Sequence, residues 1–342
     1  MFNCLPFCPS LARWALVGTV CVLVIRATSG TARAAGTIIS TGFESPYTAG
    51  PLQGQFGWVS AGSGTSSATV QNSIKLSGSQ AVQVVRAANS DRRWAVQLAG
   101  FPTQSLVAID WDMRVSQTPG STSFGPFFGI EAYDDAGQPL GLLGSLGVDA
   151  TTGDVLYQIQ DSGVFTETGQ NVLFNQWHHY RVLLDFSTDT YRGYFDGNLV
   201  ASTGFVDRSF NLNDFTDADI SAIAAAGDPA SLALASSAVF DNLVIRDGFG
   251  DYDVDGDIDT ADYALWRTSF GQSVQYAGNG ADGNNNGVVD AADYVVWRKR
   301  FGASPSSGAG SANLVPEPAS LFFALMSLQV IAIATARRQR PL

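Results

Sequence analysis

Between residues 36 and 247, the hydrophobic positions fall into short runs that either alternate with polar residues or are wholly apolar. Strong turn signals separate the runs, including Asp135-Ala136-Gly137, Thr152-Gly153-Asp154 and Asp196-Gly197-Asn198. Alternation is typical of strands that bury one face, and such turns are typical of antiparallel neighbours. The runs with this pattern are 105–116, 125–134, 154–161, 178–187, 190–197, 198–205 and 238–247. They predict a mainly β domain, an antiparallel two-sheet jelly-roll sandwich.

One segment of this domain has a helical pattern instead. Residues 214–226 begin with acidic residues and continue into an alanine-rich stretch. Acidic residues favour the first turn of a helix, and alanine favours its interior. We therefore expect a short helix over 214–226.

A loop rich in side-chain oxygen occurs twice after residue 247, beginning at Asp251 and again at Asp282. Gly256 and Gly287 stand where a calcium loop turns sharply. At the next position, Asp257 and Val288 can each supply a backbone carbonyl. The oxygen-bearing side chains are Asp251, Asp253, Asp255, Asp259 and Asp262 in the first copy and Asp282, Asn284, Asn286, Asp290 and Asp293 in the second. Because a hard cation takes oxygen ligands, the pattern predicts two Ca²⁺ sites; the alternative is an acidic, glycine-rich linker without fixed structure.

Each loop runs into an apolar stretch with the same offsets, YALWR in one copy and YVVWR in the other. The pair resembles a type I dockerin, in which two loop–helix units bind calcium and pack antiparallel. The resemblance implies a small α-helical module with two EF-hand-like calcium loops over residues 248–303, folded largely by calcium binding. It also implies a cohesin-like surface protein as partner. Positions 10 and 11 depart from the family, because Ala261, Ala291 and Ala292 replace hydroxyl residues and only Thr260 remains, which leaves that partner open.

Four aromatic residues follow the loops at helical spacing, namely Tyr263, Trp266, Tyr294 and Trp297. Such spacing places them on one face of each helix. We expect them to form a small core shared by the two helices, and the alternative is a contact surface.

The beginning of the chain, residues 1–35, has the pattern of a secretory signal peptide. Arg13 precedes an apolar run over 14–25 that is too short to span a bilayer, and Ala32-x-Ala34 fits a signal peptidase site. All cysteines lie in this segment, at Cys4, Cys8 and Cys21. The exported chain is therefore expected to lack disulfides, a catalytic thiol and a cysteine-bound zinc ion.

The end of the chain has a second targeting pattern after a Gly/Ser/Ala-rich linker over 304–314. Residues 315–342 combine Val315-Pro316-Glu317-Pro318, an apolar run over 319–336 and a basic cluster at Arg337, Arg338 and Arg340. This tail resembles the PEP-CTERM sorting signal of bacteria, which implies a transmembrane segment recognised and cleaved by an exosortase. The alternative is a plain C-terminal membrane anchor. Both interpretations place the protein at the cell surface or in the extracellular space.

The large domain, residues 36–247, carries several short features in a characteristic order. They are Gly42-Phe43-Glu44, Gly57-Trp58, the stretch NQWHHY at 175–180, the hairpin YRGYFDGNLV at 191–200 and Val239-Phe240-Asp241-Asn242. This order resembles concanavalin A-like jelly rolls of the laminin-G-like type. Such domains bind or cleave carbohydrate, and some bind only protein, so the resemblance leaves the function open.

A glycoside hydrolase needs two carboxyl groups across the scissile bond. The Glu-x-Asp-x-Glu strand motif that enzymes of this fold carry is missing, and the nearest substitute is Asp110 with Asp112. On one strand face these carboxylates lie roughly 6.5–7 Å apart. We expect Glu131 and Tyr133 on a neighbouring run to line the same concave face. The alternative is a solvated polar sheet face without chemistry.

Exposed aromatic rings form the sugar platform of many carbohydrate-binding modules. Trp94, Trp111 and Tyr133 are the candidates here, although aromatic residues of a sandwich are also frequent in its core. Arg92 and Arg93 adjoin Trp94 in what we expect to be a loop. His178 and His179 are adjacent in a strand, so their side chains point to opposite faces and cannot share a metal.

Glu44 near the first strand and Asp241 on the last strand form a further candidate pair. In several jelly-roll carbohydrate-binding modules such acids share a structural calcium ion between neighbouring terminal strands. The resemblance implies a third Ca²⁺ site here, and the alternative is two unrelated surface acids.

The net charge of the chain is -12. Such a surface repels nucleic acid and anionic lipid, which excludes both as partners. The sequence as a whole predicts an exported cell-surface protein with a non-catalytic sandwich that binds extracellular polysaccharide or matrix, and a calcium-binding module for assembly with other proteins. The alternatives are a glycoside hydrolase or polysaccharide lyase of the same fold, and a purely structural matrix protein.

Overall fold

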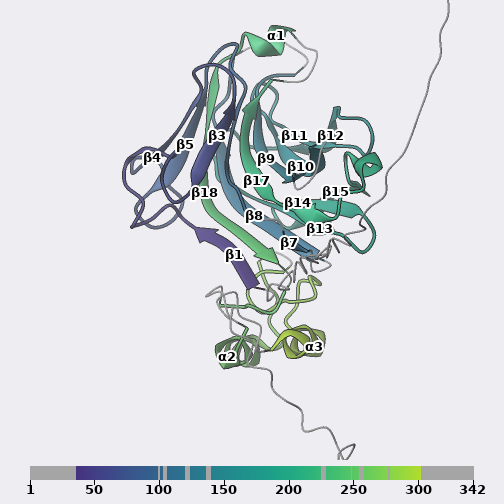
Figure 1. Cartoon of the computed structure of the whole chain (residues 1–342). Helices are drawn as coiled ribbons and strands as arrows, with labels where there is room; N and C mark the ends of the chain where they lie inside the picture. The colour runs from purple at the N-terminus through teal and green to yellow at the C-terminus, as the bar shows by residue number, and fades with distance from the viewer. Residues whose placement is uncertain are drawn as a thin grey trace, which may run out of the picture. The chain divides into compact units, whose positions relative to one another are not determined.

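The computed structural model of the chain describes residues 36–98, 101–102, 106–119, 124–135, 140–224, 229–247, 249–253, 258–275 and 278–301. A sandwich of two antiparallel sheets occupies the first part, and two helices follow it (Figure 1). The predicted signal peptide, linker and sorting tail lie outside the described residues, as do the loop positions Asp255 and Asp257.

The larger sheet has nine strands. Eight of them run in the order β15 (Asn198–Gly204), β14 (Thr190–Phe195), β13 (His178–Asp185), β8 (Leu106–Val115), β18 (Ser236–Asp247), β5 (Ala81–Arg86), β4 (Ser67–Gln71) and β2 (Gly50–Pro51). The ninth, β1 (Gly36–Thr41), pairs with the end of β18, so Gly36 lies opposite Asp247. The first and last strands of the sandwich are therefore neighbours.

The second sheet has seven strands. Their order is β12 (Phe165–Asn171), β11 (Asp154–Gln158), β10 (Gly141–Asp149), β9 (Phe127–Asp134), β17 (Asp217–Ile223), β6 (Arg92–Val96) and β3 (Trp58–Gly62). β7 (Phe101–Pro102) and β16 (Asp214–Phe215) form a separate two-stranded pair. Along the chain, β7 follows β6 and β16 precedes β17. The antiparallel two-sheet sandwich predicted from the alternating runs is confirmed.

Apolar side chains from both sheets form one core. Trp58 and Trp94 enter it from the seven-stranded sheet, and Trp111 enters it from the nine-stranded sheet, where its ring stacks on that of Tyr180 at 5.4 Å. Side chains alternate between core and exterior along each strand, so every second residue of the seven-stranded sheet faces away from the core.

The predicted helix over 214–226 is wrong. Residues 214–215 and 217–223 form β16 and β17, and the short helix α1 (Pro229–Leu232) and the 3₁₀ turn η1 (Arg208–Phe210) lie elsewhere. Ala218, Ile220 and Ala222 of β17 lie in the core with acidic or hydroxyl residues between them. This period of two overrides the helix propensity of alanine, because β17 is flanked by β9 and β6 inside the sheet.

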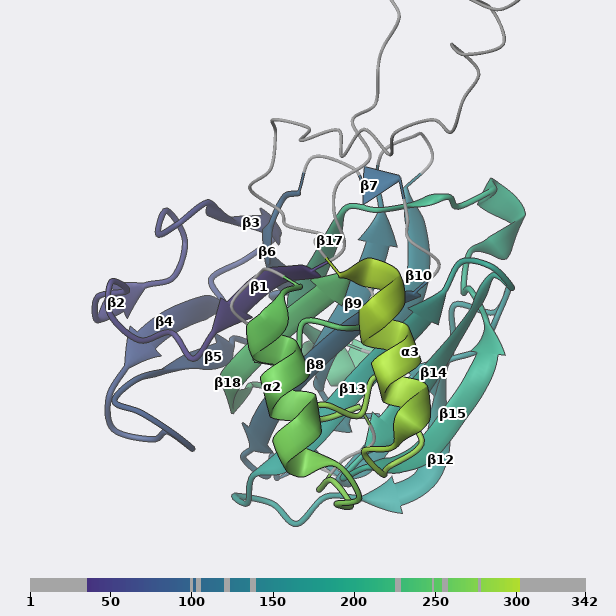
Figure 2. The same ribbon diagram turned by 90° about the horizontal axis from the view of Figure 1, so that it is seen from below.

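Two helices of equal length, α2 (Thr260–Ser269) and α3 (Ala291–Arg300), each follow one of the oxygen-rich loops. They lie side by side (Figure 2) and share a small core. Trp297 is buried in this core, and Tyr263, Trp266 and Tyr294 pack against it, as predicted for these aromatic residues. None of the helices among the described residues is long and apolar enough to cross a bilayer.

Candidate functional site

Polar side chains gather on the outer face of the seven-stranded sheet, away from the core. Phe128, Ile130 and Ala132 of β9 point into the core, so the residues between them point outward. The same alternation applies to β17 and β6. The polar residues that face outward on these three strands are Arg93, Glu131, Tyr133, Asp217, Asp219 and Ser221, and Gln97, directly after β6, lines the same face.

A pocket of about 260 Å³, here called the outer-sheet pocket, opens on this face between β3, β6, β9 and β17. Asp217, Asp219 and Asp135 supply its acidic lining, and Arg93 and Tyr133 line it as well. Exposed apolar side chains, those of Val59 and Leu140, complete the lining. An apolar surface with a few convergent polar groups is typical of a small-molecule site.

Glu131 lies beside the pocket and is held by two donors. The Arg93 Nε donates to Glu131 Oε2 at 2.6 Å, and the Ser221 hydroxyl donates to the same oxygen at 2.6 Å. Only 2% of Glu131 is exposed. Arg93 thus forms an ion pair with Glu131, and its charge also partly offsets the rise in the pKa of Asp219.

The acids of β17 are electrostatically crowded. Burial and the neighbouring Asp217 and Glu131 raise the pKa of Asp219 to about 8. Burial and Asp135 raise the pKa of Asp217 to about 7, although Gln97 Nε2 donates to its Oδ2 at 3.3 Å. Burial and the nearby Glu131 also raise the pKa of Tyr133, so its hydroxyl stays protonated and can donate. The pocket therefore favours a ligand that brings hydrogen-bond donors or positive charge.

Of the three aromatic residues predicted to bind ligand, the structure brings only Tyr133 to this pocket. Trp94 is 2% exposed and Trp111 is fully buried, and both belong to the core, so neither can be a sugar platform. Arg93 lies in β6 and not in the predicted loop. The sequence reasoning missed Asp217 and Asp219 because it placed them in a helix, although the alternation D-A-D-I-S-A-I at 217–223 is the signal for a strand.

The predicted catalytic group of Asp110, Asp112 and Glu131 does not form one site. Asp110 and Asp112 lie on β8 of the nine-stranded sheet, and Glu131 lies on β9 of the other sheet. Their expected common face is therefore a wrong prediction, because β8 and β9 are consecutive in sequence but belong to different sheets.

Asp110 is the centre of a buried ion network. The Arg181 Nε donates to its Oδ1 at 2.6 Å, and the Arg246 Nη2 donates to its Oδ2 at 2.8 Å. Burial alone would raise the pKa of Asp110, but the two guanidinium groups hold it well below its usual range. A carboxylate fixed by two arginines is suited to holding strands together and not to proton transfer.

His179 joins Asp112 to the same network. Its Nδ1 lies 3.0 Å from Asp112 Oδ1, and its Nε2 lies 3.4 Å from Asp110 Oδ1. Burial opposes the charged ring, but the hydrogen bonds to both aspartates raise the pKa of His179 to about 9. His178 instead contacts Asp196, with its Nδ1 2.7 Å from Asp196 Oδ2. A pocket of about 450 Å³ adjoins these groups, yet their charges already pair with one another.

Glu44 and Asp241 both hold the segment 76–80. Glu44 Oε1 accepts from the backbone N–H of Ser79 at 2.8 Å, and Asp241 Oδ2 accepts from that of Leu76 at 2.9 Å. The predicted neighbourhood of the first and last strands is confirmed by the pairing of β1 with β18. A calcium ion shared by these two acids stays a prediction.

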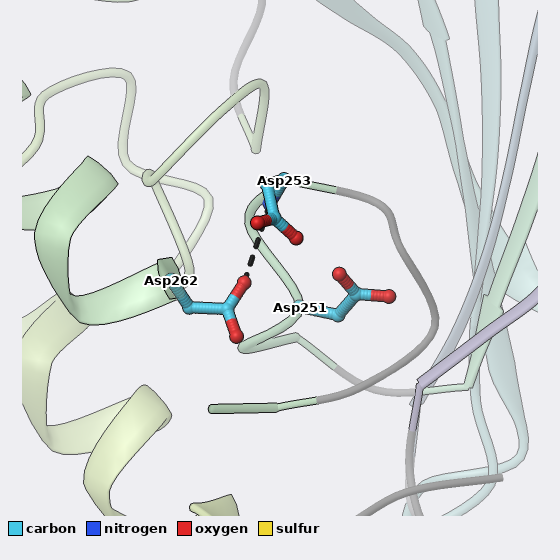
Figure 3. A group of neighbouring side chains, drawn as sticks. All are labelled: Asp251, Asp253 and Asp262. Atoms are coloured by element: carbon cyan, nitrogen blue, oxygen red, sulfur yellow. Dashed lines mark hydrogen bonds between the residues drawn. The ribbon is translucent and has the colours of Figure 1, made fainter. Parts of the chain in front are cut away.

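In the first oxygen-rich loop, three carboxylates converge. One oxygen of each of Asp251, Asp253 and Asp262 lies within 4.8 Å of the others (Figure 3). Asp262 is fully buried, and its oxygens accept from the backbone N–H groups of Tyr252, Asp253 and Asp259. Crowded carboxylates fit a hard divalent cation, which neutralises their repulsion, so this donor set could hold Ca²⁺.

In the second loop, Asp293 repeats the backbone hydrogen bonding of Asp262. Asp293 accepts from the backbone N–H of Asn284 at 2.8 Å and from that of Asp290 at 2.6 Å. Asp282 accepts from the N–H groups of Asn286 and Gly287. Four further oxygen donors are predicted for this loop, and all lie in the segment 284–290. They are the side chains of Asn284, Asn286 and Asp290 and the backbone carbonyl of Val288.

The two loop–helix units are tied to each other by a reciprocal pair of bonds. The Trp266 indole of α2 donates to the Asp290 carbonyl at 2.8 Å, and the Trp297 indole of α3 donates to the Asp259 carbonyl at 2.8 Å. Asp259 and Asp290 are the N-caps of the helices, each in a capping box with the aspartate three residues later. Each helix therefore anchors the end of the other unit's loop.

No family model matches the chain, and no curated protein matches it. Among solved structures, it is similar to a protein described as cellulose induced protein Cip1, with a TM-score of 0.44 and 15% identity over 60% of this chain and 96% of that one. It is also similar to an endo-β-1,4-glucuronan lyase from the fungus Trichoderma reesei, with a TM-score of 0.43 and 10% identity over 63% of this chain and 97% of that one. The alginate lyase Aly36B gives a TM-score of 0.41 and 13% identity over 62% of this chain and 97% of that one.

Proposed function

We propose that this is an exported, cell-surface protein whose sandwich, a concanavalin A-like jelly roll, binds a polysaccharide without cleaving it. The observation that carries the proposal is the outer-sheet pocket, where Tyr133 and exposed apolar side chains stand beside several hydrogen-bonding groups. A sugar ring presents an apolar face and a rim of hydroxyl groups, which this combination complements.

The environment of Glu131 favours binding over catalysis. A glycoside hydrolase needs one carboxylate that can attack or activate water and one acid that can protonate the leaving oxygen. Glu131 is buried and accepts two hydrogen bonds on one oxygen, so it is not free to approach a sugar.

The test measures binding of soluble polysaccharides to the full exported chain in calcium, by calorimetry. We expect Tyr133→Ala to weaken binding of the best ligand by on the order of tenfold, the loss of about 1.4 kcal/mol. Phe210→Ala is the matched control, because Phe210 is an exposed aromatic residue outside the pocket. Equal affinities for Tyr133→Ala and the parent chain would contradict the placement of the site.

A second candidate is glycoside hydrolysis, or cleavage by a lyase, at the same pocket. It is favoured by the register of the sheet, which pairs Asp219 with Glu131 across β17 and β9. Cross-strand neighbours have Cβ atoms roughly 4.5–5.5 Å apart, and the pKa of Asp219 suits a general acid. Release of reducing ends by the parent chain, lost in Asp219→Asn, would establish this second function.

For residues 248–303 we propose a dockerin that binds two calcium ions and links the protein to a cohesin-like surface partner. Support comes from the converging Asp251, Asp253 and Asp262 and from the equivalent construction around Asp293. Calorimetric titration should give two calcium sites in the parent chain. Asp262→Ala and Asp293→Ala should each remove one, and an unchanged stoichiometry would contradict the ligand assignment.

We further propose removal of residues 1–35 on export and recognition of residues 315–342 by an exosortase, which leaves the protein at the cell surface or outside the cell. The sequence patterns of both segments support this. Mass spectrometry of the protein recovered from its native host tests it, and a mature chain that begins at Met1 would exclude the signal peptide.

A further inference from the structure

The Asp219 carboxylate is buried in the outer-sheet pocket and has no hydrogen-bond donor within the described part of the chain. Asp219 is 8% exposed and lines the pocket, and it accepts no hydrogen bond from the residues that the structure describes. By contrast, the neighbouring Glu131 has Arg93 and Ser221, and Asp217 has Gln97. A buried carboxylate without a donor is costly, and a ligand that supplies the donor would remove that cost.

A metal ion does not fit this arrangement. Within the described ranges, the carboxylates of Asp251, Asp253 and Asp262 are the one acidic group whose oxygens lie within 4.8 Å of one another. The acids of the outer-sheet pocket are spread more widely than that. The pocket acids therefore do not form the compact cage of oxygen ligands that a metal ion needs.

The charge of the pocket selects against acidic polymers. Asp135, Asp217 and Asp219 line it, and its one lining cation, Arg93, is already paired with Glu131. A uronate or sulfate group would meet uncompensated like charge, which costs binding energy in a partly buried site. A positive group would meet three carboxyl groups with free acceptor positions.

We propose, on the basis of the polysaccharide-binding function above, that the outer-sheet pocket binds a polysaccharide whose sugars carry free amino groups, with one ammonium held between Asp219 and Asp217. An ammonium group offers three donors and no acceptor, which complements two or more carboxyl groups on one wall. Tyr133 and the apolar lining then contact the sugar ring that carries the amine. Burial and neighbouring carboxylates raise the pKa of Asp217 and of Asp219, and a cation between the two side chains offsets both effects.

The experiment compares four tetrasaccharides by calorimetry on the full exported chain, in calcium and near neutral pH. They are tetramers of glucosamine, N-acetylglucosamine, glucose and a uronic acid. We expect the glucosamine tetramer to bind on the order of tenfold or more tightly than its acetylated form, because acetylation removes the charge and leaves the ring unchanged. We expect the uronic acid tetramer to bind least.

Two variants test the residue assignment. Asp219→Asn should abolish the preference for the free amine, while the affinity for the glucose tetramer changes little. Glu167→Gln is the matched control, because Glu167 is an exposed acid on β12 of the same sheet and outside the pocket. It removes the same charge and should keep the preference.

The outcomes separate the two proposals. Equal affinity for the amine and acetylated tetramers overturns the amino-sugar inference but leaves polysaccharide binding in place. Binding of none of the four tetramers and of no longer polysaccharide overturns the proposed function itself. Tightest binding of the uronic acid tetramer overturns the charge argument, and retention of the amine preference in Asp219→Asn overturns the assignment of that residue.

Discussion

Asp219 makes the folded protein less stable as the pH rises. Its pKa is about 8 in the folded state, whereas an unfolded aspartate has a value near 4. Between these values the folded chain binds more protons than the unfolded chain, so stability falls as pH increases through this window. Asp219→Asn should therefore raise the free energy of unfolding by on the order of a few kcal/mol at about pH 9, and hardly change it at about pH 4.

Thermal unfolding at both pH values measures this effect. Each kcal/mol of change in the free energy of unfolding shifts the melting temperature by roughly 2–4 °C for a domain of this size. Glu167→Gln again serves as the control, with no pH-dependent gain expected. The same gain for Asp219→Asn at both pH values would contradict the electrostatic cause. A residue that lowers stability is typical of a binding site, where function and stability trade off.

Asp110 stabilises the folded protein, in contrast to Asp219. Asp110→Asn removes the charge that compensates Arg181 and Arg246, both of them buried. Breaking such a buried network costs roughly 3–5 kcal/mol, which urea unfolding should show. Affinity for sugar at the outer-sheet pocket should be unchanged, because Asp110 lies on the other sheet. Loss of sugar binding in a folded Asp110→Asn variant would return this residue to the candidates for the site.

Site residues could be predicted from the sequence where their spacing within one short segment is enough to define the site. The converging Asp251, Asp253 and Asp262 follow from loop positions within one short segment. The outer-sheet pocket joins β6, β9 and β17, which are distant in sequence, and only the sheet order brings Arg93 to Glu131. Whether Trp94 or Tyr133 faced the core also depended on strand register, which the sequence did not determine.

At the scale of elements, the reciprocal indole bonds couple α2 to α3. Trp266→Phe keeps the ring in the small core but removes the donor to the Asp290 carbonyl. We expect a loss of about 1 kcal/mol in the stability of the helical pair and weaker calcium binding by the second loop, because Asp290 is one of the ligands proposed for that loop. Calorimetric calcium titration measures the change. Trp177→Phe, in the sandwich, should leave both calcium affinities as they are.

Strands with clear alternation were predicted well, and the exception is instructive. The runs at 105–116, 125–134 and 178–187 contain β8, β9 and β13. The stretch 217–223 has the same alternation, but its alanines favoured a helix locally, and the sheet neighbours β9 and β6 decided the outcome. Tertiary context of this kind is not encoded in a short window.

At the scale of the whole molecule, the helical pair contacts the nine-stranded sheet within one compact unit. Phe249 packs with Ala108 and Leu183, and the Arg181 Nη1 donates to Asn285 Oδ1 at 2.7 Å. Asn285 lies inside the second oxygen-rich loop, for which we propose calcium binding. We expect a calcium chelator to lower the melting temperature of the sandwich by a few degrees, because the ordered loop supports this contact.

Asn285→Ala should reduce that calcium dependence, and Asn198→Ala on the exposed edge strand β15 should preserve it. If the melting temperature of the sandwich in the parent chain does not depend on calcium, the sandwich and the helical pair are energetically independent. The sequence predicted both parts but not their contact, because Arg181 and Asn285 belong to different modules and no local pattern links them.

The pairing of β1 with β18 also bears on how the sandwich responds to force. Gly36 and Asp247 are opposite each other, so the chain enters and leaves the sandwich at the same end of this strand pair. A force that pulls the two ends of the sandwich, residues 36 and 247, apart would load the backbone hydrogen bonds of this pair one after another and not all together. Such a geometry yields at low load, and β1 would peel away before the two sheets separate.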